Sequence, residues 1–220
     1  MSTVRIWDLP TRLFHWCFAA CVVGAYVAVK MDAMDWHVRF GLSALGLVSF
    51  RIVWGFIGPH HARFGNFVRG PGAMSSYLRE LGSGTAKSAG HNPLGTLSVL
   101  AMLIDLGAQA VMGLFISDDV MVQGPFYGKV PDATSDLLAT LHKYNQWVFI
   151  TLVVLHLLAV TWYTQAKKEP LVRAMVTGDM PADRLPAGSQ ASEDTAGVRL
   201  RALGLAIIVA ALIWWIQSLG

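Results

Sequence analysis

Residues 141–158 read LHKYNQWVFITLVVLHLL, an apolar run with a histidine near each end. His142 and His156 are fourteen residues apart. At about 100° and 1.5 Å per residue, two helical residues with this separation lie on nearly the same face, about 21 Å apart along the axis. The spacing therefore predicts two ligand positions on one helix, one near each side of a bilayer.

The composition is that of a membrane protein. Of the 220 residues, 54% are hydrophobic and only 14% are charged, whereas a soluble domain carries about 25% charged residues. A helix needs about 20 apolar residues to cross a bilayer. Five stretches meet this requirement, near residues 12–30, 36–57, 93–116, 141–166 and 199–218. We therefore expect an all-α integral membrane protein with five transmembrane helices.

Lysine and arginine are distributed unevenly around these spans. Twelve basic residues flank them on one side: Arg5, Arg12, Arg63, Arg69, Arg79, Lys87, Lys167, Lys168, Arg173, Arg184, Arg199 and Arg201. The other side carries Lys30, Arg39, Lys129 and Lys143, together with Asp32, Asp35, Asp118, Asp119, Asp132 and Asp136. The positive-inside rule puts the N-terminus in the cytoplasm and the C-terminus in the periplasm of a bacterial inner membrane. The net charge of +3 reflects this bias, and we expect no nucleic-acid partner.

The orientation predicts how four histidines pair by depth. His15 stands near the cytoplasmic start of the first span, and His37 near the periplasmic start of the second. His142 is also periplasmic, and His156 lies deeper, toward the cytoplasm. Only one pairing matches these levels: His15 with His156, and His37 with His142.

Such pairs suit haem. Neutral imidazole is a good axial ligand for haem iron, and two imidazoles leave no open coordination position, which favours electron transfer over oxygen binding. A helical bundle supplies facing ligands from different helices. The only cysteines, Cys17 and Cys21, form no Cys-x-x-Cys-His motif, so we expect no covalently attached haem.

Other residues near the histidines fit the same reading. Small residues would leave room for the macrocycle: Gly24, Gly41 and Gly46. The haem propionates need cations or hydrogen-bond donors, and Arg12 and Arg39 are candidates for this role.

Further polar residues leave alternatives open. Three histidines fall in the cytoplasmic loop, as ordinary loop residues or near a quinone headgroup or the propionates: His60, His61 and His91. Asp105 lies in the middle of the third span, where a carboxyl group is costly and is usually functional. It either handles protons or forms a hydrogen bond within the bundle.

Several motifs resemble a known family. Asp8–x3–Arg12–x2–His15–Trp16 resembles the first-helix signature of the prokaryotic cytochrome b561 family, which includes the cytochrome b subunits of membrane-bound nickel–iron hydrogenases. Four further segments are similar to the hydrogenase-type branch: Arg63–Phe64, Phe67–Val68–Arg69–Gly70–Pro71, Gly90–His91–Asn92–Pro93–Leu94–Gly95 and the run from Lys168 to Gly178. The resemblance covers roughly residues 4–178.

The resemblance implies a four-helix transmembrane bundle that holds two b-type haems, each with two histidine ligands. The family pattern maps onto the same residues: His15, His37, His142 and His156. It also implies electron exchange between a periplasmic redox protein and the quinone pool. We accordingly expect a cytochrome b561-type domain over residues 1–178, a cytoplasmic linker over 179–198 and an additional transmembrane helix over 199–218.

The chain is thus interpreted as a diheme b-type cytochrome, the electron-transfer subunit of an oxidoreductase complex. It would transfer electrons across the inner membrane between the quinone pool and a periplasmic partner such as a hydrogenase, a cytochrome c or another dehydrogenase. One alternative is a stand-alone superoxide:quinone oxidoreductase, but that enzyme would need a cationic path to the outer haem, and the outer loops are acidic. An alternative of another class is a histidine-lined metal-ion transporter, for which paired carboxylates within the spans would be expected.

Overall fold

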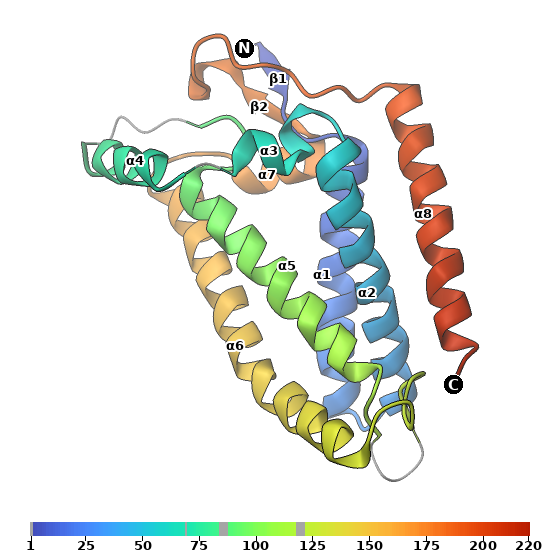
Figure 1. Ribbon diagram of the computed structural model, residues 1–220. Coiled ribbons are helices and arrows are strands. Elements are labelled where there is room, and N and C mark those ends of the chain that lie inside the picture. The colour runs from blue at the N-terminus through green and yellow to red at the C-terminus, as the bar shows by residue number, and fades with distance from the viewer. Residues whose placement is uncertain (1, 69, 84–87, 118–121) are drawn as a thin grey trace. The chain divides into compact units, whose positions relative to one another are not determined.

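The computed structural model of the chain describes residues 2–68, 70–83, 88–117 and 122–220 (Figure 1). Four charged residues that contribute to the predicted orientation lie outside the described residues: Arg69, Lys87, Asp118 and Asp119. Helices make up most of the described chain.

Five helices are long and apolar enough to cross a membrane, which confirms the prediction. They are α1 (Leu9–Lys30), α2 (Met34–Ile57), α5 (Pro93–Gly113), α6 (Asp132–Gln165) and α8 (Ala196–Gln217). Only α6 differs markedly from its predicted span, because residues 132–140 are too polar to count as membrane-spanning and yet form its first turns. His142 consequently lies well inside α6 rather than at its start.

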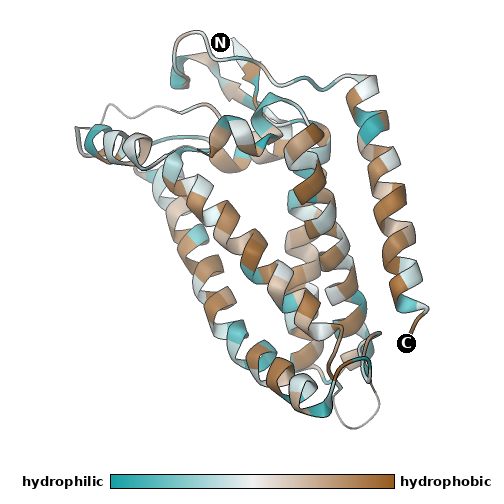
Figure 2. Cartoon of the chain, viewed as in Figure 1, coloured by the Kyte–Doolittle hydropathy of each residue, from teal (hydrophilic) through white to brown (hydrophobic). Residues whose placement is uncertain are grey.

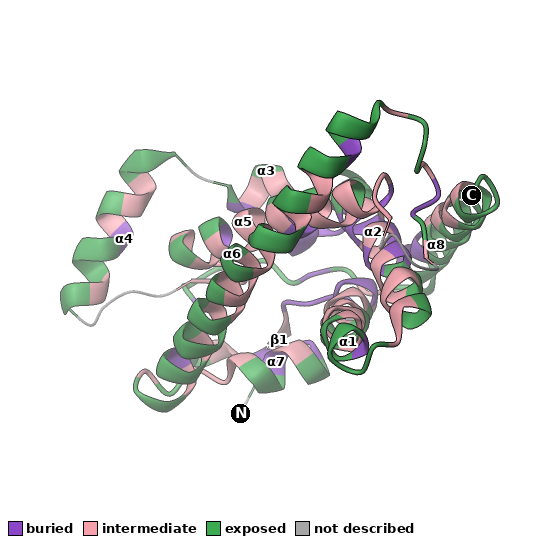
Figure 3. Cartoon of the chain, turned by 90° about the horizontal axis from the view of Figure 1, so that it is seen from below, coloured by how far each residue is buried: buried purple, intermediate pink, exposed green. Residues whose placement is uncertain are grey.

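These helices carry large apolar side chains on their outsides. Figure 2 shows them mostly brown, and Figure 3 shows long exposed faces on the same helices. Ile104 in α5 and Ile208 in α8 are 71% and 67% exposed, respectively. Such apolar surfaces are unfavourable in water and favourable in contact with lipid tails. The backbone of a helix also forms all its hydrogen bonds internally, as the lipid environment requires. The chain is therefore a multi-pass membrane protein.

The chain divides into two compact units. The first comprises Met1–Leu13, Ile52–Ala101 and Val154–Ala202. Its small elements are β1 (Thr3–Arg5), η1 (His60–Ala62), α3 (Phe64–Phe67), α4 (Pro71–Ser83), α7 (Leu171–Thr177), β2 (Asp179–Pro181) and η2 (Ala182–Arg184). The N-terminal segment, α7, β2 and the residue that follows η2 contribute a small apolar core made of Ile6, Trp7, Ala174, Met180 and Leu185.

Gly178 joins the N-terminal segment to α7 within this unit. β1 and β2 pair antiparallel, with Arg5 opposite Asp179. Just before β2, Gly178 ends α7 with a φ of +90°, which glycine adopts without steric cost. Its carbonyl accepts hydrogen bonds from the amides of Ile6 (2.8 Å) and Trp7 (3.1 Å). A Cβ atom at this position would lie 2.7 Å from the carbonyl oxygen of Trp7, so a larger residue would force the two segments apart.

Asp8 caps the start of α1. Its Oδ1 accepts a hydrogen bond from the Thr11 amide (2.9 Å), as an N-cap side chain does. The same oxygen accepts from the indole Nε1 of Trp54 in α2 (3.2 Å). Asp8 is fully buried and Trp54 is 1% exposed. Asp8 therefore fixes the beginning of α1 against α2, which gives the acidic residue of the first-helix motif a structural role.

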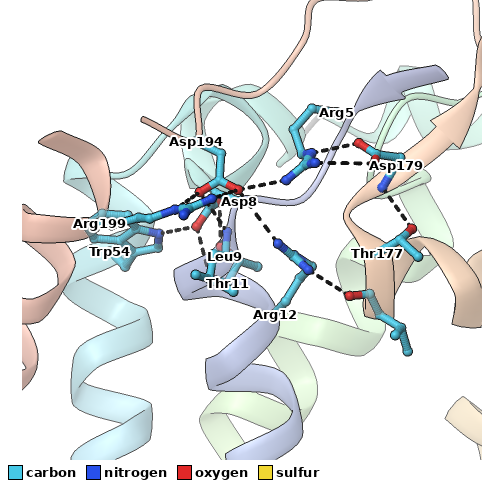
Figure 4. A network of polar contacts seen from close by, with 11 residues as sticks. Arg5, Asp8, Leu9, Thr11, Arg12, Trp54, Thr177, Asp179, Asp194 and Arg199 are labelled. Atoms are coloured by element: carbon cyan, nitrogen blue, oxygen red, sulfur yellow. Dashed lines mark hydrogen bonds and ion pairs between the residues drawn. The ribbon is translucent and has the colours of Figure 1, made fainter. Parts of the chain in front are cut away.

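Residues 179–198, predicted as a linker, pack against the N-terminal segment. The amide of Ser192 donates to the carbonyl of Arg5 (2.7 Å). Asp194 accepts hydrogen bonds from the guanidinium groups of Arg5 (2.8 Å) and Arg199 (3.0 Å) and from the amide of Leu9 (3.3 Å) (Figure 4). Its side chain is 7% exposed. The side chain of Asp194 thus ties the start of α8 to the N-terminal segment.

We expect Asp194→Asn to lower the free energy of unfolding by about 2 kcal/mol. The substitution removes the carboxylate bonded to Arg199 and one of the two carboxylates bonded to Arg5, which keeps its ion pair with Asp179. Burial alone would raise the pKa of Asp194, but the hydrogen bonds from Arg199 and Leu9 and the charges of Arg199 and Arg5 lower it. The stabilisation is therefore present above the ordinary carboxyl pKa of about 4, and it is lost as the pH falls through that value toward the lower folded-state pKa. Thermal unfolding in detergent across this pH range measures both effects.

Asp183→Asn is the matched control. Asp183 pairs with Arg184 at 3.9 Å, and the two side chains are 67% and 45% exposed, so removing this carboxylate should cost less than about 1 kcal/mol. Equal destabilisation by the two substitutions would contradict the role assigned to Asp194.

The second unit comprises Phe14–Arg51, Met102–Val153 and Leu203–Gly220. In it, the described part of the connection between α5 and α6 folds back onto the end of α5. The amide of Phe126 donates to the carbonyl of Leu114 (2.7 Å), and the amide of Gly124 donates to the carbonyl of Ile116 (2.8 Å). The hydroxyl of Ser135 in α6 donates to the carbonyl of Phe115 (2.7 Å). These bonds hold the end of α5 and the first turn of α6 together.

Candidate functional site

His37 and His142 face each other in the second unit. His37 lies in the first turn of α2, and His142 lies in α6. The centroids of their rings are 6.0 Å apart, and the ring planes are nearly perpendicular, at 86°. A bond between a metal ion and an imidazole nitrogen is about 2 Å long, so two rings that bind one metal ion from opposite sides have centroids roughly 6 Å apart. The spacing fits a pair of axial ligands.

Hydrogen bonds orient both rings for ligation. Nδ1 of His37 lies 3.0 Å from the carbonyl oxygen of Ala25, and Nδ1 of His142 lies 3.0 Å from that of Gln109. A carbonyl oxygen only accepts, so each Nδ1 carries the proton and the lone pair remains on Nε2. Metal-binding histidines are usually held in this way, with the second ring nitrogen bonded to a carbonyl or carboxylate.

A cavity of about 420 Å³ adjoins both rings. Pockets that hold cofactors measure roughly 300–1,000 Å³. The lining is mostly apolar and includes several small residues: Gly41, Ala44, Ala110 and Gly113. These residues leave space beside the two imidazoles, so the donor set and its surroundings fit a haem with two histidine ligands.

The three glycines selected from the sequence have different roles in the structure. Gly41 lines the cavity, and a Cβ atom there would meet nothing within 4 Å. A Cβ atom on Gly24 would lie 2.8 Å from the ring of Phe40, and one on Gly46 would lie 3.1 Å from Ile213 in α8. Gly24 and Gly46 therefore permit close packing between helices, and only Gly41 gives room at the cavity.

A chain of polar side chains surrounds His142. The amide nitrogen of Gln109 in α5 donates to the backbone carbonyl of His142 (3.0 Å). Nδ2 of Asn145 in α6 donates to Oε1 of Gln109 (2.9 Å). The Asn145 side chain also lies beside the carboxyl group of Asp105, and both roles considered for Asp105 stay predictions.

The sequence reading missed Gln109 and Asn145. A signal was present, because amide side chains within a transmembrane helix usually bond across to a neighbouring helix. The separation of four residues between Asp105 and Gln109 also places them on the same face of α5.

His15 lies in α1, and His156 lies in α6, the helix that also carries His142. His15 belongs to the second unit and His156 to the first. His15 is half-buried in α1, and its ring contacts that of Trp16 edge-on, with 4.9 Å between centroids. His156 is half-buried in α6. Their pairing as ligands of one haem stays a prediction.

The two arginines proposed for the propionates have other contacts. Nη1 of Arg12 donates to the carbonyl of Val176 at the end of α7 (2.7 Å), and Nη2 lies 3.7 Å from the carboxylate of Asp194. The guanidinium of Arg39 lies 5.2 Å from the centroid of the Trp36 ring. A role of either arginine toward haem stays a prediction.

The three loop histidines line a second cavity, of about 460 Å³, in the first unit. His61 is buried, and its Nε2 donates to the carbonyl of Gln190 (2.7 Å). Burial lowers the pKa of His61, while the hydrogen bond to Gln190 opposes this change. His91 packs between Trp7 and Phe67, with ring centroids 4.7 and 4.5 Å apart. The three histidines therefore lie in one pocket.

Tyr77 and Glu80 of α4 also line this second cavity. The hydroxyl of Tyr77 forms a hydrogen bond with that of Tyr163 in α6 (2.9 Å). Burial and this hydrogen bond raise the pKa of Tyr77, so it remains a protonated phenol. The cavity thus combines aromatic surface with several groups that exchange hydrogen bonds.

Comparisons with known proteins agree with the fold and with the motifs. A family model described as prokaryotic cytochrome b561 matches residues 6–178. Two similar proteins are the probable Ni/Fe-hydrogenase B-type cytochrome subunits of Azotobacter chroococcum mcd 1 and Azotobacter vinelandii, which are 25% and 24% identical to this chain over 219 residues. Each alignment covers 80% of this chain and 88% of the relative. No solved structure matches the chain.

Proposed function

The chain belongs to the prokaryotic cytochrome b561 family, and on this basis we propose that it is a diheme b-type cytochrome that transfers electrons across the bacterial inner membrane. The main support is the pair formed by His37 and His142, whose rings are 6.0 Å apart. Both rings have Nδ1 bonded to a carbonyl, and both border a cavity of about 420 Å³. We refer to this position as the outer haem site.

The second haem would be held by His15 and His156, which we refer to as the inner haem site. Two observations support this site. The sequence predicts a similar membrane depth for the two histidines, and His156 lies on the helix that carries His142. A haem with two histidine ligands supplies one-electron redox chemistry. The chain provides the ligands, the apolar surroundings and the fixed ring orientations that adjust the potential of such a group.

The proposed electron donor or acceptor at the outer haem is a periplasmic redox protein. The names of the two relatives, hydrogenase B-type cytochrome subunits, favour a nickel–iron hydrogenase. The excess of lysine and arginine on one side supports a cytoplasmic N-terminus and a periplasmic C-terminus. In this arrangement the outer haem site faces the partner, and the inner haem site faces the quinone pool.

We assign the quinone step to the second cavity, which is lined by His60, His61 and His91. Reduction of one quinone to quinol takes up two electrons and two protons. The haems would deliver the electrons one at a time. The aromatic rings of Phe67 and Tyr77 suit a quinone ring, and the polar groups beside them suit its two oxygens.

The absorption spectrum and haem content of the purified protein test the proposed function. We expect the sharp α and Soret bands of reduced b-type haem, with two haems per chain. A protein that purifies without haem, as a histidine-lined transporter would, refutes the proposal, and a single haem per chain refutes the diheme part of it.

Filling the second cavity should slow the reaction with quinol. Ala73 in α4 lines this cavity, and Ala73→Trp would place a large ring in it. We expect haem reduction by a short-chain quinol to become at least about tenfold slower, equivalent to about 1.4 kcal/mol of lost binding, with unchanged haem content. Stopped-flow absorption at the α band measures the rate.

Leu78→Trp is the matched control. Leu78 lies on the same helix, is 49% exposed and does not line the cavity. Its replacement should leave the rate unchanged. A normal rate in Ala73→Trp would show that quinol reacts elsewhere, without bearing on haem binding.

A further inference from the structure

Gln109 attaches to His142 at two points. Its backbone carbonyl accepts the hydrogen bond from Nδ1 of the imidazole (3.0 Å), and its side-chain amide donates to the backbone carbonyl of His142 (3.0 Å). The first contact fixes the ring, and the second fixes the backbone that carries the ring. The backbone carbonyl at position 109 thus holds the imidazole, and the Gln109 side chain holds the backbone that carries it.

The side chain of Gln109 is itself held in place. Its Oε1 accepts a hydrogen bond from Nδ2 of Asn145 (2.9 Å), and the Asn145 side chain also lies beside the carboxyl group of Asp105. Asp105 and Gln109 are one turn apart on α5, and His142 and Asn145 are one turn apart on α6. Gln109, His142 and Asn145 thus form a continuous set of contacts between the two helices, with Asp105 beside Asn145. Polar side chains at this depth are costly unless they are bonded, so the set has a single favourable arrangement.

We propose that Gln109 is a positioning residue for the outer haem, and that Asn145 and Asp105 act through it. The proposal rests on the proposed function, because it assigns His142 as an axial ligand. The positioned quantity is the angle between the two imidazole planes, 86° in the structure. Partners beyond the ligands control ring orientation and ligand basicity at many metal sites. A ring fixed before the haem binds also has little freedom to rotate when the iron changes charge.

The test compares Gln109→Leu with Gln146→Leu. Gln109→Leu removes the side-chain hydrogen bond to the His142 backbone and keeps the backbone carbonyl that accepts from Nδ1. Gln146 is a second glutamine that lines the same cavity, but its amide donates to the carbonyl of Lys143 in its own helix (2.7 Å). Ferric haems with perpendicular imidazole planes give a more anisotropic low-spin EPR signal than haems with parallel planes. We expect one such signal to change in Gln109→Leu, together with the midpoint potential of that haem, while the other haem is unchanged. Transfer of the affected haem to apomyoglobin should be roughly ten- to a hundredfold faster.

Asn145→Leu provides a second measurement if Gln109→Leu does not fold. It leaves both contacts between Gln109 and His142 and removes only the support of the Gln109 side chain, so the same EPR signal should change by less. Asp105→Asn should change it least of the three. This order supports positioning through Gln109.

Three results would overturn the inference. They are an unchanged EPR signal and potential in Gln109→Leu, equal changes in Gln146→Leu, or changes in both haems together. Failure of the proposed function is distinguishable, because wild-type protein would then lack the outer haem. Wild-type protein with two haems and an unresponsive Gln109→Leu variant would refute the positioning role alone.

Discussion

Replacing His142 with leucine is expected to reduce the haem content from two haems per chain to one. The substitution removes one of the two axial ligands of the outer haem and leaves His37 without its partner across the cavity, where the two rings are 6.0 Å apart. Leucine fills a similar volume without a nitrogen, so the bundle should still fold. The pyridine haemochrome assay measures the haem content, and the reduced spectrum identifies the haem that remains.

His37→Leu should remove the same haem, because both residues are assigned to one iron. The control is His60→Leu, which changes a histidine of the second cavity and should leave both haems in place. If His37→Leu and His142→Leu remove different spectral components, the two histidines belong to different haems. The pairing of His37 with His142 would then be wrong, even though the chain binds two haems.

The transmembrane helices could be predicted from the sequence because a membrane requires a simple pattern of residues. A span must be long and apolar, and four of the five predicted spans match their helices to within three residues at each end. The exception is α6, because its first turns are too polar for a prediction based on hydropathy to include them. The facing positions of His37 and His142 were predictable for the same reason, since helix direction and residue depth together locate a side chain in a bilayer.

Contacts that depend on tertiary packing were harder to predict from the sequence. Residues 179–198 have the composition of a linker, and nothing local indicates that Asp194 would bond to Arg5, which is 189 residues away. Likewise, one cavity is lined by His60, His61 and His91. The turns that bring these residues together have no periodic sequence pattern from which they could be predicted. The first-helix motif illustrates both cases. His15 was selected for its chemistry, whereas the structural role of Asp8 depends on Trp54, forty-six residues away.

Replacing His156 with leucine should separate the outer haem from the quinone pool. In the proposed path, electrons pass between quinol and the outer haem only through the inner haem, which His15 and His156 would hold. The variant should therefore retain one haem that dithionite still reduces, whereas reduction by quinol falls to the background rate. Stopped-flow absorption with each reductant measures the two reactions on the same sample.

The comparison with His142→Leu tests the order of the two haems as well as their ligands. That variant should also retain one haem, but quinol should reduce it at a rate close to that of the inner haem in the wild-type protein, because the path from the second cavity is intact. If quinol reduces the remaining haem rapidly in His156→Leu and slowly in His142→Leu, the order is reversed. Quinone would then react on the side of His37 and His142, and the periplasmic partner would have to reach its haem by another route.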